Sequence, residues 1–206
     1  MSETQPRRRG RPPGDGREAI LEATGDLLRE RGISRLTTRE VAARAGVSEA
    51  SVFYHYGDRA KLLQAAFDRG LAPLLAIAAQ GEVAGADRHQ VLERVGRGIE
   101  RFLMEAMPIL TAAQSDAELR DELAAMMSER DLGPHRGVSR VGDYLAAEQA
   151  AGRVRGDVDP HAVAASFVGT CVMRAFQATM HLPTRRLPPL SAVIDALDTM
   201  LEPPPG

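Results

Sequence analysis

Three ring-bearing side chains, Tyr54, His55 and Tyr56, stand side by side within residues 46–63, GVSEASVFYHYGDRAKLL. A glycine turn precedes them, and a basic, leucine-bearing segment follows. Phenol and imidazole groups on a protein surface can hydrogen-bond to the edges of bases and to phosphate oxygens. The chemistry that these residue types favour is therefore recognition of nucleic acid.

Helical periodicity gives this segment two faces. At about 100° per residue, Val52 and Tyr56 point toward a core. Ala50, Ser51 and Tyr54 point the other way. Small residues let a helix backbone approach the major groove, and long polar tips reach bases and phosphates. This outward face has the character of a recognition helix.

Three further residues of the predicted recognition helix lie beside its outward face or in its first turn. Phe53 and His55 lie on its flanks, and the tip of His55 reaches DNA together with that of Tyr54. Glu49 lies in the first turn, where its carboxylate either accepts a hydrogen bond from a cytosine amino group or offsets the charge of the helix end.

Candidate phosphate contacts lie on both sides of the recognition helix. Thr37 and Thr38 stand at the start of the helix before it, and Arg59 and Lys61 at the start of the helix after it. Hydroxyls, helix N-termini and basic side chains all bind phosphate oxygens. Arg39 reaches either a phosphate or a guanine edge.

Two short helices must position these residues. Thr37 and Glu40 form a capping-box pattern for the first, which Gly46 ends after barely two turns. Ser48 caps the second, which reaches about Tyr56. Two short helices joined by a tight, glycine-bearing turn form a helix-turn-helix.

The rest of the chain is also predicted to be helical. Apolar residues recur at helical spacing from Glu18 to Gly32, and a long helix follows Asp58, with a kink expected at Pro73. Further helical stretches follow residue 85, interrupted at Pro108 and restarting later at Pro134 and Pro160. Since no stretch alternates with a period of two residues, we expect an all-α fold of about nine helices. The expected divisions are a disordered basic N-terminal arm (1–16), a helix-turn-helix DNA-binding domain (17–63) and a larger C-terminal regulatory and dimerisation domain (64–206).

Composition and charge narrow the class of protein. The chain of 206 residues is 44% hydrophobic and 26% charged, and no run approaches the roughly 20 apolar residues of a membrane span. We therefore expect a soluble, cytoplasmic protein without a membrane partner. Its net charge of −2 divides into +3 for residues 1–61 and −5 for residues 62–206, so nucleic acid is sought at the basic end. The arginines of the N-terminal arm either enter a minor groove or stay in solvent.

The segment LTTREVAARAGVSEASVFYHYGDRAKLL, residues 36–63, resembles the DNA-binding signature of the tetracycline-repressor (TetR) family. The leading helix, AILEATGDLLRERG, and the total length resemble the family as well. The resemblance implies a dimeric transcriptional regulator whose C-terminal helices hold a small-molecule pocket and most of the dimer interface. Two positions depart from the family pattern: Tyr56 replaces the usual phenylalanine, and Glu49 stands where a neutral or basic residue is common.

Adaptable apolar side chains in the C-terminal helices are candidates for that pocket. Methionine fills irregular space around ligands, although a stripe of it at helical spacing is more often plain core. The candidate ligand-binding residues are Phe102, Met126, Met127, Tyr144, Met173, Arg174 and Phe176. The guanidinium of Arg174 needs a partner in an apolar helix, which is either a residue across a dimer interface or an anionic group of the ligand, unless the side chain is exposed.

Motifs for catalysis and for metals are missing from the sequence. The remaining histidines show no paired ligand spacing, and Cys171 is the only cysteine, so no metal site and no cofactor are predicted. No nucleophile elbow is present, so we expect no enzyme.

The prediction is a ligand-responsive repressor that binds double-stranded DNA at a palindromic operator as a homodimer and is released by a small apolar effector. Two alternatives stay open. One is a regulator of the same fold that is controlled by a protein partner or not controlled, and the other is a helical enzyme or carrier that retains the DNA-binding head as a relic.

Overall fold

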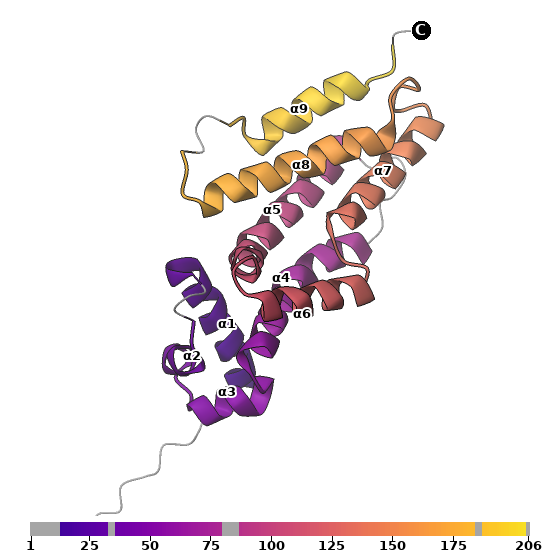
Figure 1. Cartoon of the computed structure of the whole chain (residues 1–206). Coiled ribbons are helices and arrows are strands. Elements are labelled where there is room, and N and C mark those ends of the chain that lie inside the picture. The colour runs from indigo at the N-terminus through magenta and orange to yellow at the C-terminus, as the bar shows by residue number, and fades with distance from the viewer. Residues whose placement is uncertain (1–12, 33–35, 80–86, 184–186, 205–206) are drawn as a thin grey trace, which may run out of the picture. The chain divides into compact units, whose positions relative to one another are not determined.

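The computed structural model describes residues 13–32, 36–79, 87–183 and 187–204, and within these ranges the ordered elements are helices (Figure 1). This confirms the predicted all-α class. The helices are α1 (Pro13–Arg31), α2 (Thr38–Ala45), α3 (Glu49–Tyr56), α4 (Arg59–Ala79), α5 (Arg88–Ala113), α6 (Ala117–Glu129), α7 (Pro134–Ala150), α8 (Pro160–Thr179) and α9 (Leu190–Leu201). None of these described helices is long and apolar enough to span a membrane.

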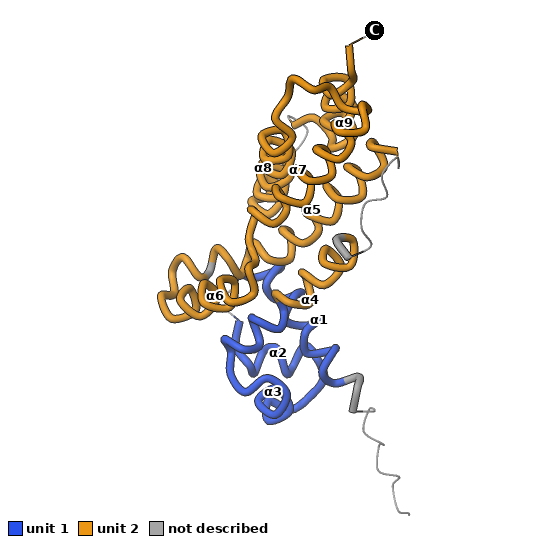
Figure 2. Tube along the Cα trace, turned by 90° about the vertical axis from the view of Figure 1, so that its right-hand side faces the viewer, with its two compact units in different colours: residues 1–66 blue, residues 67–206 orange. Residues whose placement is uncertain are grey.

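The chain divides into two compact units, Met1–Ala66 and Phe67–Gly206, which Figure 2 shows in different colours. Unit 1 contains α1, α2, α3 and the first residues of α4, and unit 2 contains the rest. Helix α1 begins at Pro13, within the stretch expected to be a disordered tail. Residues 1–12 of the expected basic arm lie outside the described residues.

Unit 1 is built on a small apolar core to which each helix contributes. Helix α1 buries Ile20 and Leu27, α2 buries Val41, and α3 buries Val52. The hydroxyl of Thr24, which is fully buried, donates a hydrogen bond of 2.7 Å to the carbonyl oxygen of Ile20, so its burial leaves no unsatisfied donor. Helices α2 and α3 therefore pack into this core through the faces that periodicity predicted to point inward.

Helix α5 differs from the sequence prediction, because it continues through Pro108 where an interruption was expected. Proline removes one backbone donor and crowds the preceding turn, which costs about 3 kcal/mol in an exposed helix. Ala106 and Ile109, on either side, are each only 1% exposed. Burial of this turn offsets the local cost of the proline, and local propensity alone could not reveal that burial.

In unit 2, helix α8 packs along both α5 and α7, and α9 packs against α5 (Figure 1). The core lies between these helices and includes Leu92, Leu145, Phe167 and Ile194. Close approach requires a residue without a side chain at Gly96, because a Cβ atom there would lie 2.9 Å from the Cζ atom of Phe167. Asp159 caps α8 by accepting from two backbone amides, as predicted, and Pro160 occupies its first turn.

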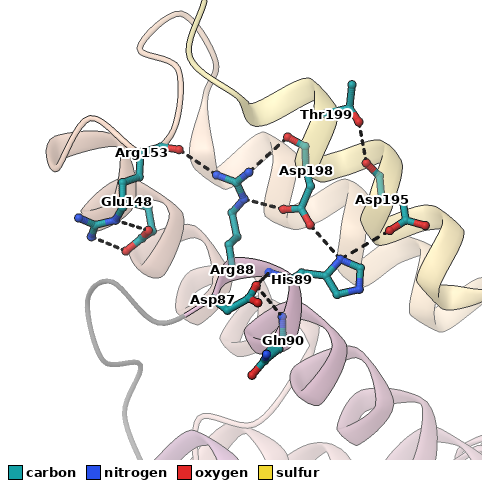
Figure 3. Close-up of polar contacts among 9 residues, drawn as sticks. All are labelled: Asp87, Arg88, His89, Gln90, Glu148, Arg153, Asp195, Asp198 and Thr199. Atoms are coloured by element: carbon teal, nitrogen blue, oxygen red, sulfur yellow. Dashed lines mark hydrogen bonds and ion pairs between the residues drawn. The ribbon is translucent and has the colours of Figure 1, made fainter.

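A polar network joins the start of α5 to α9 and to the segment that follows α7 (Figure 3). The guanidinium of Arg88 donates to the Asp198 carboxylate at 2.6 Å and to the Arg153 carbonyl at 2.9 Å. Arg153 in turn donates two hydrogen bonds of 2.7 Å to Glu148, whose side chain is 2% exposed. The two hydrogen bonds from Arg153 compensate the charge of the buried Glu148 carboxylate, so the network connects these segments without leaving a buried charge unpaired.

Candidate nucleic-acid interface

Helix α2 begins and ends as its sequence predicts. The Thr37 hydroxyl accepts a hydrogen bond of 3.2 Å from the Glu40 backbone amide, and Gly46 ends the helix in the left-handed conformation, with φ of 68°. A residue with a side chain rarely adopts this φ, so glycine permits the sharp turn. The Ser48 hydroxyl then accepts from the Ser51 amide at 3.1 Å and starts α3.

Tyr56 anchors helix α3 in unit 1. Its ring is buried, and its hydroxyl donates a hydrogen bond of 2.9 Å to the carbonyl oxygen of Arg17 in α1. The Arg17 guanidinium lies 5.7 Å from the centre of the same ring, which is within range of a cation–π interaction. The hydrogen bond and the ring contact between Tyr56 and Arg17 were not predicted from the sequence, because the two residues lie 39 positions apart.

The outward face of α3 is open to solvent. Tyr54 is 85% exposed and Phe53 is 49% exposed. Ala50 is also exposed, whereas Ser51 and His55 are half-buried. The rings of Tyr54 and His55 meet edge to face with their centres 5.1 Å apart, which restricts both side chains. The face of α3 that periodicity predicted to point outward therefore lies on the surface of unit 1.

Glu49 is held by a residue of the neighbouring helix. The Thr38 hydroxyl donates a hydrogen bond of 2.6 Å to a carboxylate oxygen of Glu49. Two predicted DNA contacts thus bind each other across the helix-turn-helix, which orients the carboxylate at the start of α3. The sequence places both residues at helix starts but gives no sign of their pairing.

The predicted phosphate contacts are all at the surface or partly so. Arg39 and Arg59 are exposed, and Thr38 is half-buried. The Lys61 ammonium lies 3.2 Å from the Asp58 carboxylate, and the Lys61 backbone amide donates to the same residue at 2.8 Å. The Thr37 hydroxyl accepts from the Glu40 backbone amide and donates to the Glu40 carboxylate at 3.5 Å, so a phosphate oxygen would compete with Glu40 for this donor.

Ion pairs connect the helices of unit 1 that position the outward face of α3. The Arg44 guanidinium of α2 donates two hydrogen bonds, of 3.0 and 2.6 Å, to the two carboxylate oxygens of Glu30 in α1. The hydrogen bond from Arg44 holds the pKa of Glu30 below its usual value. The backbone hydrogen bond from Lys61 likewise lowers the pKa of Asp58, so both carboxylates stay charged at neutral pH.

The structure disperses the residues predicted to bind a ligand. Phe102 is half-buried and packs edge to face against Phe67, with ring centres 5.4 Å apart. Tyr144 belongs to the core of unit 2, and Met173 and Phe176 are 46% and 50% exposed. Met126 and Met127 are half-buried on α6. Sequence spacing shows on which face of its helix an apolar residue lies. Whether that face belongs to the core, to a cavity or to the surface depends on what packs against it.

Arg174 has its partners within the chain. Its Nε atom donates a hydrogen bond of 2.5 Å to the Glu100 carboxylate of α5, and its terminal nitrogen donates to the carbonyl oxygen of Pro188. Both side chains of the ion pair are about one-fifth exposed, 21% and 22%. The charge of Arg174 therefore requires neither a ligand nor a second chain, in contrast to the alternatives that the sequence offered.

Metal-binding groups do not gather in the described ranges: no three His, Cys, Asp or Glu side chains lie together as a metal site requires. Burial raises the pKa of the Cys171 thiol to about 12, so the sulfur is protonated at neutral pH.

Comparison with known proteins gives matches to both units. Residues 20–66 match bacterial regulatory proteins of the tetR family, and residues 90–201 match the C-terminal domain of AefR-like transcriptional repressors. An HTH-type transcriptional repressor of Mycobacterium tuberculosis is 31% identical over 144 residues, which are 67% of this chain and 76% of that protein. The class D tetracycline repressor of Escherichia coli is 37% identical over 49 residues, which are 24% of this chain and 22% of that repressor.

Solved structures share the same fold. The crystal structure of a TetR-family transcriptional regulator from Rhodococcus sp. superposes with a TM-score of 0.67 at 24% identity, covering 91% of this chain and 98% of that one.

Proposed function

Since the chain belongs to the tetR family of bacterial regulatory proteins, we propose that it is a cytoplasmic repressor that binds a palindromic operator as a homodimer and leaves it when a small molecule binds. The main support for DNA recognition is that α3 has one buried face and one exposed face. Its inward residues, Val52 and Tyr56, are 1% and 6% exposed, whereas Tyr54 is 85% exposed. An exposed aromatic on a rigidly anchored helix suits direct contact with base edges.

The contacts divide into reading and positioning groups. Tyr54 and His55, with Glu49 oriented by Thr38, would touch base edges in the major groove. Arg39, Arg59 and Lys61 would bind phosphates and set the register without reading sequence. The small side chains of Ala50 and Ser51 would let the α3 backbone approach the groove, and Thr37 would present the start of α2 to the backbone of DNA.

Dimerisation is supported by an exposed stripe on α8. Its opposite face is buried in the core of unit 2, yet Met173 and Phe176 are 46% and 50% exposed, and Met180, which caps the C-terminal end of α8, is 55% exposed. They share a helical face with Gly169, beside which there is open space. Apolar side chains on one face and a residue that permits close approach suit a self-complementary contact between two copies of the chain.

A two-fold dimer requires an operator with matching symmetry. Half-sites on one face of DNA lie about 34–36 Å apart for one helical turn, so a change in the spacing of two recognition helices would lose register. Helix α4 carries Arg59 and Lys61 at its start and continues into unit 2. A ligand that moves α4 would therefore act on the same helix that holds two phosphate contacts.

Selection of bound fragments from random double-stranded DNA tests the proposal. We expect enrichment of a palindrome, and a probe carrying it should bind the full chain with two protein chains per duplex. The matched control is the same duplex with one half-site scrambled, which should lose most of the affinity. Enrichment of no sequence at physiological salt, or binding by one chain per duplex, would contradict the proposal.

A further inference from the structure

Helices α4 and α5 line a partly open hollow of about 220 Å³ within unit 2. Its lining residues are Gly70, Pro73 and Ile77 of α4, and Arg94, Arg97, Gly98, Arg101 and Phe102 of α5. This volume lies below the roughly 300–1,000 Å³ of sites for drug-sized ligands. The hollow therefore suits a small molecule or one end of a larger one. We name it the α4–α5 groove.

One wall of the groove is strongly basic. Arg94, Arg97 and Arg101 follow one another at intervals of three and four residues, which places them on one face of α5. All three are exposed. Arg97 donates to Glu93 at 2.6 Å, although its side chain remains 70% exposed. In the part of the chain that the structure describes, Arg101 has no hydrogen bond or ion pair.

Carboxylates also lie along the groove. The carboxylate of Glu105 lies beside Gly70, where a Cβ atom would be 3.0 Å from it. The nearby Asp68 is bound at 2.5 Å by Arg130 of α6. Glu93 thus binds Arg97 and Glu105 lies at the Gly70 end, whereas Arg101 keeps an exposed guanidinium without a paired carboxylate in the described part of the chain. Arginine forks are suited to planar oxyanions such as carboxylates, and to phosphates.

The floor of the groove is apolar. Pro73 and Ile77 line it, and Ile77 approaches α5 closely at Gly98, because a Cβ atom there would be 2.7 Å from the Cδ1 atom of Ile77. Phe102 is held beside them by its edge-to-face contact with Phe67. A ligand with an apolar body could therefore lie on these side chains while its charged end meets the arginines.

We propose that the α4–α5 groove binds a small amphiphilic anion, in which one carboxylate or phosphate group meets Arg101 and its neighbours and an aliphatic or aromatic body covers Ile77 and Phe102. This inference rests on the proposed function, because it names the chemical class of the effector. It also adds an anionic group to the small apolar effector that the sequence predicts. The groove wall formed by Gly70, Pro73 and Ile77 belongs to α4, so an occupant contacts the helix that begins with Arg59 and Lys61.

Isothermal titration of the full chain with octanoate tests the site directly. Octanoate should bind, while octan-1-ol, which lacks the anion, and acetate, which lacks the apolar body, should each bind at least tenfold more weakly. Arg101→Gln should weaken octanoate binding at least tenfold, and Arg101→Lys should retain binding within a few-fold. Arg120→Gln is the matched control, since Arg120 is an exposed arginine of α6 outside the groove.

Several results would overturn the inference. They are absence of octanoate binding at millimolar concentration, equal affinity for octanoate and octan-1-ol, and equal effects of Arg101→Gln and Arg120→Gln. Each variant's thermal midpoint without ligand is measured alongside, so a folding defect is separated from loss of the site.

Operator binding distinguishes this inference from the proposed function. Release of the selected operator by octanoate in the wild type, but not in Arg101→Gln, would support both. Octanoate binding that depends on Arg101 but leaves operator affinity unchanged would support the anion site and contradict control by this ligand. Operator binding without any anion site would contradict the inference alone.

Discussion

Tyr54 and Tyr56 are two residues apart in sequence, yet one side chain is 85% exposed and the other 6%. Helical periodicity turns the Tyr56 ring into the core, where its hydroxyl binds the Arg17 carbonyl, and turns Tyr54 into solvent. The same residue type therefore serves as an anchor at one position and as a candidate base contact at the other.

Replacement of Tyr54 by alanine should weaken operator binding by roughly 1–3 kcal/mol and relax sequence preference at one or two positions. The reason is that an exposed phenol contributes to base contact and little to the core. Titration against the selected operator and against single-base variants would measure this, with the thermal midpoint expected to stay near that of the wild type. Unchanged affinity and preference would show that the outward face of α3 does not read DNA.

Arg59→Ala is the matched comparison for Tyr54→Ala. A phosphate contact should weaken binding to all sequences alike and reduce the slope of affinity against salt by about one. If Arg59→Ala instead altered sequence preference, its assignment to the phosphate group would be wrong.

At the scale of elements, ion pairs and glycines decide how the helices pack. Glu30 and Arg44 connect α1 to α2 through two hydrogen bonds, and this contact lowers the pKa of Glu30. A carboxylate whose folded pKa is depressed contributes stability above its unfolded pKa and loses that contribution as pH falls through the folded value. The contribution of Glu30 is therefore complete at neutral pH and lost in acid, below its ordinary pKa of 4.5.

Glu30→Gln should consequently lower the thermal midpoint at pH 7, and the difference from wild type should shrink toward pH 3. Thermal unfolding at both pH values would measure it, at low salt because Glu30 is exposed and its pair is screened. Glu22→Gln is the control, because Glu22 is an exposed glutamate of the same helix. A difference for Glu30→Gln that is equally large at both pH values would argue against a role for the ion pair.

Gly96→Ala should destabilise unit 2 by about 1 kcal/mol. The added methyl group would meet Phe167 at 2.9 Å and Leu190 at 3.2 Å, and overpacking costs of about 1–3 kcal/mol exceed the gain of about 0.5–1 kcal/mol in helix propensity. Gly137→Ala, which meets Val168 only at 3.7 Å, should stabilise by about 0.4–1 kcal/mol. Denaturant unfolding would compare the two, and equal signs would contradict the packing argument.

At the scale of the whole molecule, the proposed assembly depends on the exposed stripe of α8. Phe176→Glu should convert a dimer to a monomer at micromolar concentration, because a charge would be buried against its symmetry mate. Sedimentation would measure the mass, and operator affinity should fall with it. Met104→Glu adds the same charge to an exposed site on α5 and should leave the dimer intact. A Phe176→Glu variant that stays dimeric would place the interface elsewhere.

Local patterns in the sequence determined much of this protein. Thr37, Gly46, Ser48 and Asp159 act as caps and turns where predicted, because capping depends on hydrogen bonds between residues two to five positions apart. The inward and outward faces of α3 follow from periodicity for the same reason. Recognition of the family also rests on this local motif.

Only the tertiary structure decided the features that join distant segments. The Thr38–Glu49 hydrogen bond, the pairing of Arg174 with Glu100 and the persistence of α5 through Pro108 all depend on which helix faces meet. The spacing of the three arginines in the α4–α5 groove shows that they share one face of α5, but the same spacing is equally typical of a face that only meets solvent. Spacing assigns a residue to a face of its own helix, whereas burial, partners and cavities depend on what another part of the chain places opposite that face.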